Sequence, residues 1–371
     1  MSPKVSIGLP VYNGANYLRE ALDSILSQTF RDFEVVISDN ASTDATWEIC
    51  MEYAAKDPRI RFSRNDRNLG AARNFNRAFE LSSGEYFKWA AHDDVLHPDF
   101  LLRCVRVLDE LPSAVVCFTE TVEINDMGNF LGEYNFDNTM NFDSLKPHER
   151  FRLLMDMRHW CMAVFGLMRA EALKRSPLIG GYVGSDRCLL AELGLMGQIY
   201  RVPESLFFRR HHPDSSVVQM KLPQARVGWF DADKAGRLCF PNWKYGLEYF
   251  KSVIKVRLEA AEKIFCYIAV ANWYVKRAKW LSIDVITAGR MLLRRTAFGR
   301  KLDSLLFIDL TKAARTLLRR TTFGRKLDSL LFFDLKEPLR GLLLRSVAGR
   351  KLLAARWELI YRLNPWRRPL R

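Results

Sequence analysis

Short apolar segments alternate with amphipathic segments through the first hundred residues, and this alternation restricts the fold more than any other feature of the sequence. The apolar segments have the length and composition of buried strands, and they are residues 5–11, 33–39, 60–63 and 85–91. The amphipathic segments have apolar residues at helical spacing, and they are residues 15–28, 45–55 and 71–81. Buried strands joined by helices predict an α/β fold with a mostly parallel sheet.

Carboxylates stand at the ends of two predicted strands. Asp39 ends the second strand, and Asp93 and Asp94 follow the fourth. Open α/β sheets bind ligands at the carboxyl ends of their strands, so these side chains are candidate binding residues. Adjacent carboxylates repel each other, and Mg²⁺ prefers carboxylate oxygens completed by substrate phosphates. The pair therefore indicates either a metal site that binds a diphosphate or a solvated turn that also caps a helix.

The cysteines and the apolar runs argue against several classes of protein. The seven cysteines are scattered and without a Cys-x-x-Cys pair, which favours reduced thiols in a cytosolic setting over a disulfide framework or a structural zinc site. Residues 1–5 lead directly into a strand, so no signal peptide is expected. The best apolar run, residues 264–275, is too short to span a membrane.

The basic character of the chain belongs to its C-terminal third. Residues 251–371 contain 28 Lys and Arg against 9 Asp and Glu, whereas the preceding residues contain 29 against 33. A segment at 293–307 returns at 318–332, and a degraded third copy follows at 344–352. Leucines at helical spacing between basic residues predict amphipathic helices, which suit an anionic membrane surface. Packing on the rest of the chain or on a second subunit is the alternative. Nucleic acid is not expected, since no reader motif is present.

Four short motifs resemble those of family 2 glycosyltransferases, which have the nucleotide-diphospho-sugar transferase (GT-A) fold. They occur in the expected order at predicted strand ends, and they are Leu9-Pro10-Val11-Tyr12-Asn13, Ser38-Asp39-Asn40-Ala41-Ser42-Thr43-Asp44, Asn68-Leu69-Gly70 with Arg73-Asn74, and His92-Asp93-Asp94. The resemblance covers the first hundred residues and implies a GT-A sheet flanked by helices. It also implies a metal-dependent enzyme that transfers a sugar, with inversion, from a nucleotide-diphospho-sugar to an acceptor hydroxyl.

The resemblance assigns most candidate residues to the donor. In the family, the residues matching Pro10, Tyr12 and Asp39 hold the nucleoside. Those matching Asp93 and Asp94 hold the ribose and the metal-bridged diphosphate, which implies Mn²⁺ or Mg²⁺ with Asp94 as the closer ligand. The donor-binding set expected from the motifs is Pro10, Tyr12, Asn13, Asp39, Asn68, Arg73, Asp93 and Arg210.

Later residues extend the resemblance to the acceptor side. Asp186 opens a predicted helix after a glycine-containing loop and matches the family's acceptor-side aspartate, which implies the catalytic base; stabilisation by the helix dipole is its structural interpretation. Arg210 and His212 match residues that return to the diphosphate and to the metal, although they also fit a solvated basic loop. The segment 159–169 resembles a strand that lines the acceptor side, where Trp160 either stacks on a sugar or belongs to the core.

Two departures from the family pattern and two alternatives qualify this reading. Many members have an acidic residue where Ala91 stands, so a metal here would be bound by fewer carboxylates. Many have Asp where Asn40 stands, so a UDP-sugar is only weakly favoured over another donor. A sugar nucleotidyltransferase would need a basic, glycine-rich loop after the first strand, and residues 10–15 contain no basic residue. A catalytically silent scaffold associated with a membrane is the other alternative.

These observations predict three parts of the chain. Residues 1–220 are expected to form the catalytic domain, with residues 1–105 as the nucleotide-binding half and 106–220 as the acceptor half. Residues 221–290 are expected to form a helical extension, and residues 291–371 the basic repeats. Family habit suggests a peripheral enzyme on the inner face of the membrane that adds sugars to a surface polysaccharide or a lipid-linked glycan. A homo-oligomer is compatible with the same repeats.

Overall fold

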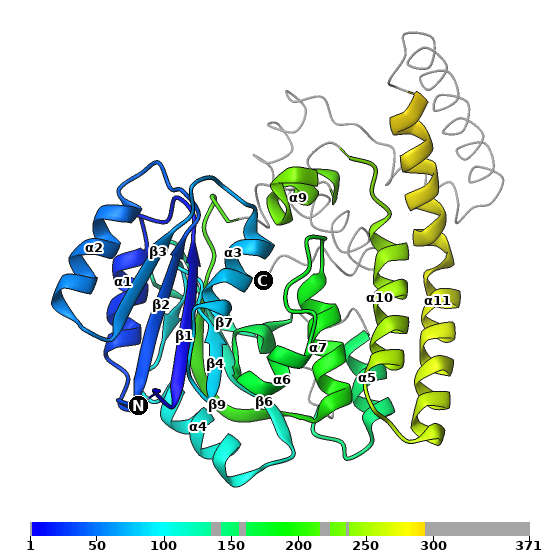
Figure 1. Cartoon of the computed structure of the whole chain (residues 1–371), viewed down its shortest axis with the longest axis horizontal. Coiled ribbons are helices and arrows are strands. Elements are labelled where there is room, and N and C mark those ends of the chain that lie inside the picture. Colours follow the sequence, from blue (N-terminus) through cyan, green and yellow to red (C-terminus); the bar gives the residue numbers. More distant parts are fainter. Residues whose placement is uncertain (1, 135–141, 156–160, 216–222, 235–236, 294–371) are drawn as a thin grey trace, which may run out of the picture. The chain divides into compact units, whose positions relative to one another are not determined.

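The computed structural model describes residues 2–134, 142–155, 161–215, 223–234 and 237–293. Residues 1–286 form one compact unit. Within it, eight strands form a sheet in the order β3-β2-β1-β4-β8-β6-β9-β5, and a further strand, β7, pairs with β6. Helices lie on both faces of the sheet (Figure 1). Trp160 and the predicted repeats after residue 293 lie outside the described residues.

The first strands alternate with helices, as the apolar periodicity predicts. The strands are β1 (Val5–Val11), β2 (Phe33–Asp39), β3 (Ile60–Arg64) and β4 (Tyr86–Trp89). The helices between them are α1 (Leu18–Leu26), α2 (Thr46–Lys56) and α3 (Ala71–Glu80). β1 pairs in parallel with β2 and with β4, and β2 pairs in parallel with β3. The carboxyl ends of all four strands therefore meet at one edge of the sheet.

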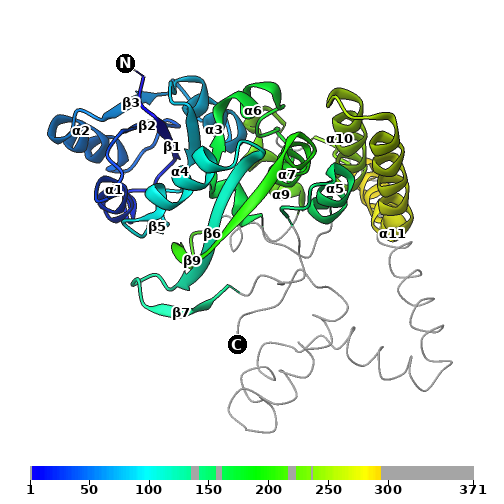
Figure 2. The ribbon, with the colours of Figure 1, turned by 90° about the horizontal axis from the view of Figure 1, so that it is seen from below.

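The second half of the sheet is mixed. Its strands are β5 (Val95–Leu96), β6 (Ala114–Ile124), β7 (Phe130–Glu133), β8 (Leu167–Arg169) and β9 (Gln198–Arg210). Its helices are α4 (Phe100–Glu110), α5 (Pro147–Met155), the 3-10 helix η1 (Met162–Phe165), α6 (Ala170–Arg175) and α7 (Ser185–Met196). β8 is antiparallel to both β4 and β6, and β6 lies parallel to β9 (Figure 2). β6 and β9 therefore point the same way as β1 and end at the same edge.

The sheet separates two apolar cores. β4 contributes to both, because Tyr86 and Ala90 belong to one core and Phe87 and Trp89 to the other. Helices α1, α2 and α4 cover the first core, and helices α3, α5, α6 and α7 cover the second. Because both faces are covered, the strands read as nearly continuous apolar runs instead of alternating ones.

Helices follow β9 in the described part of the chain. They are α9 (Pro223–Phe230), the 3-10 helix η2 (Ala232–Lys234), α10 (Pro241–Lys255) and α11 (Ala260–Leu293). α10 packs on α7 and contributes Tyr245, Tyr249 and Val253 to the second core. The extension is thus helical where it is described, and it shares a core with the sheet. None of the described helices combines the length and the apolar character that crossing a membrane requires.

Two local features differ from the sequence-based expectations. The segment 159–169 is not a continuous strand, because residues 162–165 form η1 and only residues 167–169 pair with neighbouring strands. Cys161 has a left-handed backbone (φ 50°), which is incompatible with an extended strand. The two-residue strand β5 was not expected at all. It forms because Val95 and Leu96 pair with β9, more than 100 residues later in the chain.

Candidate active site

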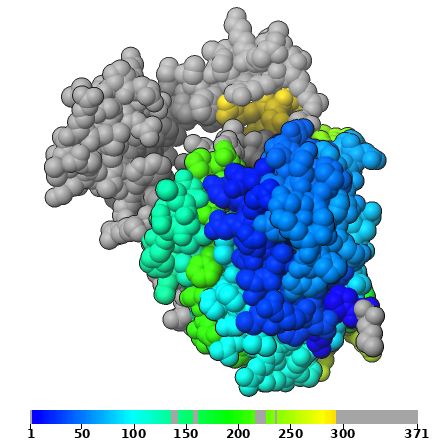
Figure 3. Space-filling view, turned by 90° about the vertical axis from the view of Figure 1, so that its left-hand side faces the viewer, coloured from blue at the N-terminus to red at the C-terminus, as the bar shows by residue number. Residues whose placement is uncertain are grey.

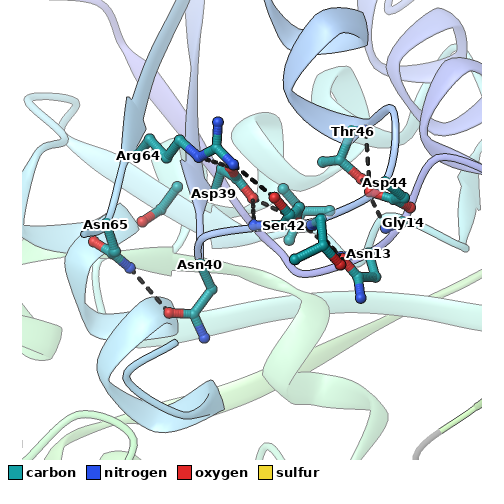
Figure 4. A network of polar contacts seen from close by, with 12 residues as sticks. Asn13, Gly14, Asp39, Asn40, Ser42, Asp44, Thr46, Arg64 and Asn65 are labelled. Carbon is teal, nitrogen blue, oxygen red and sulfur yellow. Dashed lines mark hydrogen bonds and ion pairs between the residues drawn. The ribbon is translucent and has the colours of Figure 1, made fainter. Parts of the chain in front are cut away.

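The loops after β1 and β2 are joined by short polar side chains (Figure 4). Asp39, fully buried at the end of β2, accepts hydrogen bonds on Oδ1 from the backbone N–H (3.0 Å) and the hydroxyl of Ser42. The Ser42 hydroxyl accepts from the N–H of Asn13 (2.9 Å), and Asn13 Oδ1 accepts from the N–H of Thr43 (2.8 Å). These bonds hold one loop against the other and fix the position of Asp39.

Asp44 anchors the start of α2 to the same pair of loops. Its carboxylate accepts from the hydroxyl (2.6 Å) and the N–H (3.1 Å) of Thr46 and from the N–H of Ala15 (3.1 Å). The Thr46 hydroxyl accepts in turn from the N–H of Gly14 (2.9 Å). Burial alone would raise the pKa of Asp44, but these hydrogen bonds outweigh it and lower the pKa. Asp44 is therefore ionised at neutral pH, and it holds the loops together.

Asparagine side chains organise the loop between β3 and α3. Asn40 donates to Asn68 Oδ1 (2.9 Å) and accepts from the side chain of Asn65 (3.1 Å) and from the N–H of Leu69 (2.9 Å). Asn68 Oδ1 also accepts from the N–H of Gly70 (2.9 Å). The amide of Asn40 is thus used as both donor and acceptor within the chain. The presence of Asn at position 40, which departs from the family pattern, has a structural role here.

Asn74 connects the ends of the first strands. Its side-chain NH₂ donates to the carbonyls of Ser38 (2.8 Å) and Val11 (3.3 Å), and its Oδ1 accepts from the Ser38 hydroxyl (2.7 Å) and from Asn65 (3.0 Å). A buried amide that is fully hydrogen-bonded in this way has little capacity left for a ligand. Asn74 therefore fixes the edge of the sheet to which a ligand would bind.

Arg64 lies against the outer side of Asp39. Its Nε is 3.2 Å from Asp39 Oδ2, it donates to the carbonyl of Ser42 (2.6 Å), and its guanidinium lies over the ring of Trp47 (5.2 Å to the centroid). The predicted nucleoside ligands lie nearby on β1 and the loop after it. Pro10 is buried in the strand, and the Tyr12 side chain is 44% exposed.

Charged side chains from the ends of β4 and β9 form a second cluster. Asp93 Oδ2 lies 2.9 Å from Nε2 of His212, and Asp94 Oδ1 accepts from the N–H of Arg210 (3.0 Å). The ring of Tyr17 packs against that of His212, with centroids 4.8 Å apart. The sheet therefore brings together the two carboxylates and the later Arg and His that the sequence indicated separately.

The guanidinium of Arg210 is buried among backbone carbonyls. Nε donates to the carbonyl of Asp93 (2.9 Å), and Nη1 donates to those of Asn125 (3.2 Å) and Asp126 (3.0 Å). Nη2 is 2.6 Å from the carboxylate of Glu20 in α1. In Figure 3 the N-terminal residues (dark blue) lie directly beside those of β6, β7 and β9 (cyan to green), as this ion pair requires. Arg210 thus fixes the loop that carries Asp93 against β9.

Burial and close charges shift the pKa values in this cluster. Burial, together with the charge of Asp93, raises the pKa of Asp94 to about 7. Burial alone would raise the pKa of Asp93 as well, but the hydrogen bond from His212 and the charges of both histidines outweigh it and lower the pKa. The hydrogen bond to Asp93 raises the pKa of His212, whereas burial lowers the pKa of His92. An added cation would favour the ionised form of Asp94.

Lys88 of β4 places a charge inside the first core. The residue is fully buried, its Nζ donates to the carbonyl of Trp89 (3.0 Å), and it lies over the rings of Phe100 (4.8 Å) and Phe207 (5.9 Å). Burial lowers the pKa of Lys88 to about 8. The Lys88 charge in turn acts to lower the pKa of Asp94, against the effect of burial. The apolar pattern of residues 85–91 predicts a strand but gives no sign of this role of Lys88.

Asp186 lies in the first turn of α7. α7 packs on β6 and β9 and is joined to the start of β9 by Gly197 alone, so it runs back along the sheet, with its first turn toward the edge where β6 and β9 end (Figure 1). Burial raises the pKa of the neighbouring Cys161, and a hydrogen bond with Asp186 adds to that effect. The structure therefore places Asp186 toward the same edge of the sheet as the polar loops after β1 and β2 and the charged cluster at β4 and β9.

Several buried polar atoms along this edge have no hydrogen-bond partner within the described residues. They are Glu123 Oε2, Ser185 Oγ and His212 Nδ1, together with Asp39 Oδ2, which accepts no hydrogen bond from the described part of the chain although it lies 3.2 Å from Arg64 Nε. Such atoms are almost always hydrogen-bonded in folded proteins, so their concentration at the ends of β2, β6 and β9 and at the start of α7 indicates a site for a polar ligand.

The carboxylate pair fits a divalent cation only if a substrate completes its coordination. In the part of the chain that the structure describes, no three His, Cys, Asp or Glu side chains are grouped so as to enclose a metal ion. Mg²⁺ commonly uses one or two carboxylates and takes its other ligands from phosphates and water. Asp94 is a suitable oxygen donor for an ion of this kind, shared with a diphosphate. Nδ1 of His212, which makes no hydrogen bond within the described residues, would suit Mn²⁺ better than Mg²⁺.

Comparison with known proteins identifies the family of one domain of this chain and supports the fold. Residues 6–175 match the family model for Glycosyl transferase family 2, so the chain contains a family 2 glycosyltransferase domain. The crystal structure of Staphylococcus aureus TarS 1–349 in complex with UDP-GlcNAc has a TM-score of 0.56 at 18% identity, and the match covers 78% of this chain and 81% of that one. The predicted GT-A fold and the family resemblance are both confirmed.

Curated relatives agree with this assignment. An uncharacterized glycosyltransferase of Rickettsia typhi is 37% identical over 125 residues, which are 33% of this chain and 38% of the relative. Glycosyltransferase GlyA of Streptococcus pneumoniae is 30% identical over 270 residues, which are 70% of this chain and 38% of the relative. The chain thus spans less than two fifths of the length of these relatives.

Proposed function

We propose that the protein transfers a sugar from a nucleotide-diphospho-sugar to an acceptor hydroxyl, with inversion at the anomeric carbon and with the aid of Mn²⁺ or Mg²⁺. One observation carries the proposal. Buried polar atoms of Asp39, Ser185 and His212 that make no hydrogen bond within the described residues occur at one edge of the sheet, on which the Asp93-Asp94 pair also lies. The family 2 domain, matched at residues 6–175, supplies the reaction class, which is the transfer of a sugar.

The nucleoside fits the end of the edge formed by β1 and β2. Asp39 offers Oδ2 to a ring N–H of the base, because its other oxygen is already held by Ser42. Tyr12 is exposed beside it and provides an apolar surface, and Asp93 is the proposed ligand of the ribose. UDP-sugars are the first donors to test, because the TarS complex contains UDP-GlcNAc in a protein of the same fold.

The diphosphate fits the charged cluster at β4 and β9. Asp94 and His212 would hold the divalent ion, which when bound neutralises the growing negative charge of the leaving diphosphate. The guanidinium of Arg210 is bonded to backbone carbonyls and to Glu20, so direct contact between Arg210 and the diphosphate would require Glu20 to give way. In the present arrangement Arg210 orients the loop of Asp93 and Asp94.

Asp186 is the proposed catalytic base. It takes the proton of the acceptor hydroxyl as the hydroxyl oxygen bonds to the anomeric carbon. The bond from that carbon to the diphosphate oxygen breaks, and its electron pair leaves with the diphosphate. The oxocarbenium-like transition state requires the base and the leaving group on opposite faces of the sugar. Asp186 on α7 and the cluster at β4 and β9 belong to different elements of the edge, which is compatible with that requirement.

The proposed acceptor is a growing surface polysaccharide or a lipid-linked glycan. The basic repeats, outside the described residues, are proposed to hold the enzyme on an anionic membrane surface. We expect co-sedimentation with vesicles that contain anionic lipid, and loss of co-sedimentation when the chain is shortened to Arg290. Equal sedimentation of the shortened chain would refute the membrane proposal without affecting the proposed reaction.

The proposed reaction can be tested by thermal-shift measurements with UDP, GDP and ADP, each with and without Mn²⁺. We expect one of them to raise Tm, and to do so only when Mn²⁺ is present. The variant Asp94→Asn should lose the metal-dependent shift, whereas Asp186→Asn should keep it and lose sugar transfer. A chain that responds to none of the nucleotides, or an Asp186→Asn variant with full transfer activity, would contradict the proposal.

A further inference from the structure

The turn formed by residues 231–234 lies between two parts of the proposed site. On one side it contacts the start of α3, where Arg73 Nη1 lies 2.9 Å from Asp233 Oδ2 and Arg73 Nη2 lies 3.6 Å from Asp231 Oδ1. On the other side it contacts the loop before α7, where Lys234 Nζ donates to the carbonyl of Gly181 (3.3 Å). The turn therefore joins the nucleotide-binding half to the loop that leads to Asp186.

Glycines at both contacts permit this close approach. A Cβ atom at Gly70 would lie 2.8 Å from the backbone of Phe230, Asp231 and Ala232, and Gly70 also has a positive φ of 86°. A Cβ atom at Gly181 would lie 2.8 Å from Asp231 Oδ2. Both distances are too short for a side chain, so the turn fits directly against the backbone on either side.

Asp231 is the central residue of this junction. Its side chain is only 7% exposed, compared with 39% for Asp233. Oδ2 pairs with Lys234 (2.8 Å), and Oδ1 accepts from the N–H of Asp233 (3.3 Å) and faces Arg73. Burial would raise the pKa of Asp231, but the hydrogen bond and charge of Lys234 and the charge of Arg73 outweigh it and lower the pKa. A buried carboxylate between two cations holds both of them in place.

Other contacts hold the same loop without Asp231. Asn76 of α3 makes two hydrogen bonds of 3.0 Å with the backbone N–H and carbonyl of Ile179, just before the loop. Lys244 of α10 lies over the ring of Tyr182 (5.1 Å), and Tyr245 packs against Gly184. The start of the loop is thus tied to α3 and its end to α10. The middle of the loop is held by Lys234, which bonds to the carbonyl of Gly181 and pairs with Asp231.

We infer that Asp231 is a positioning residue that sets the place of Asp186 relative to the bound donor. The inference rests on the proposed function, since it takes Asp186 as the base. Asp231 reaches Gly181 through Lys234, and Asp186 follows five residues later, in the first turn of α7. A base displaced by about 1 Å from the reacting hydroxyl loses roughly 100-fold in rate. Asp231 should therefore affect the chemical step more than the binding of the donor.

The variant Asp231→Asn tests the inference, with Asp233→Asn as the matched control on the same turn. For Asp231→Asn we expect kcat to fall about 10- to 100-fold while the donor Kd changes less than about 3-fold. Hydrogen exchange at the amides of Tyr182 and Ser185 should become faster. Asp233 also pairs with Arg73 and with Arg67, but its side chain is 39% exposed and makes no ion pair with Lys234. The Asp233→Asn variant should therefore show a clearly smaller fall in kcat than Asp231→Asn.

A second variant, Lys234→Met, keeps the carboxylate of Asp231 and removes its link to Gly181. It should lower kcat in the same way as Asp231→Asn, with partial recovery in Lys234→Arg. Native kcat in both Asp231→Asn and Lys234→Met would overturn the inference. A lower Tm of these variants with unchanged hydrogen exchange at the amides of Tyr182 and Ser185 would overturn it as well. If the native protein transfers no sugar, or if Asp186→Asn remains active, the proposed function fails instead, so the two failures are distinguishable.

Discussion

The two ends of the binding edge satisfy their polar groups in different ways. At the ends of β1, β2 and β3, amides and hydroxyls such as Asn13, Asn40 and Asn74 bond to one another and to the backbone. At the ends of β4 and β9, two carboxylates lie side by side, of which Asp93 bonds to His212, and burial raises the pKa of Asp94 to about 7. The first end is preorganised, because its polar groups hold one another in place. At the second end, the buried negative charge of Asp94 lowers the stability of the fold. A nucleoside suits the first end, and a diphosphate with its cation suits the second.

The largest effect is expected from Asp94→Asn, which removes the buried negative charge that lowers stability. Sugar transfer should fall at least about 1,000-fold, because the negative charge proposed to hold the cation is lost. The folded pKa of Asp94 is raised above its ordinary value of 3.8, so its ionisation lowers stability as the pH rises from about 4 to 7. The variant should therefore melt several degrees higher at pH 8 and gain less at pH 5.

The neighbouring substitution Asp93→Asn is the matched control and should change stability in the opposite direction. The pKa of Asp93 is lowered, so its ionised form stabilises the fold above its ordinary pKa, and this contribution is lost on acidification. We expect a lower Tm at pH 7, measured by calorimetry. Equal shifts of Tm in the two variants would show that the ionisation of Asp93 and that of Asp94 do not affect stability in opposite directions.

A smaller effect is expected from Asp39→Asn at the preorganised end. The amide cannot give the base a charged acceptor, and loss of such a hydrogen bond corresponds to roughly 10- to 100-fold in affinity. The donor Kd should rise by that factor while kcat for saturated enzyme changes less than about 5-fold. Ser42→Ala, which leaves the carboxylate but removes the hydroxyl bonded to it, should weaken binding only a few-fold. An equal loss in kcat would mean that Asp39 takes part in the chemical step.

Lys88→Met tests, through its effect on stability, how much a buried charge in β4 costs the fold. The pKa of Lys88 is lowered from 10.5 to about 8, so its buried ammonium costs roughly 3 kcal/mol below pH 8, and this cost disappears between pH 8 and 10.5. The variant should therefore melt at a higher temperature at pH 7, and its advantage should shrink toward pH 10.5. A lower Tm at pH 7 would show that the contacts with Trp89, Phe100 and Phe207 outweigh the cost of burial.

The smallest effect is expected from Asn40→Asp, which introduces the residue that is common in the family. The carboxylate would lose the donor to Asn68 Oδ1 and place negative charge beside that oxygen. Stability should fall by about 1–2 kcal/mol, as measured by urea denaturation. The order of affinity for UDP, GDP and ADP should not change, because the side chain of Asn40 bonds to the loop of Asn65, Asn68 and Leu69. A changed order would assign Asn40 to the base-binding surface.

The residues at this edge of the sheet can be predicted from the sequence, but the residues that contact and position them cannot. Asp39 and Asp94 could be placed because strand periodicity is local and parallel strands end together. The resemblance added Arg210 and His212, and the structure brings both to the carboxylates. Glu20, Lys88 and Asp231 were missed, because each acts through a residue distant in sequence or through burial that no local pattern reveals. Pairing across 190 residues, as between Glu20 and Arg210, follows from topology alone.

The contact between Tyr245 and Gly184 has a practical consequence for shortening the enzyme. A polypeptide ended at residue 220, where the catalytic domain was expected to stop, would keep every strand of the sheet and most proposed ligands. It would lack the aromatic ring that backs the loop before α7. Transplanting the acceptor half between related enzymes would meet the same difficulty, since the exchanged piece must extend at least through α10. The compact folded unit is therefore larger than its sheet.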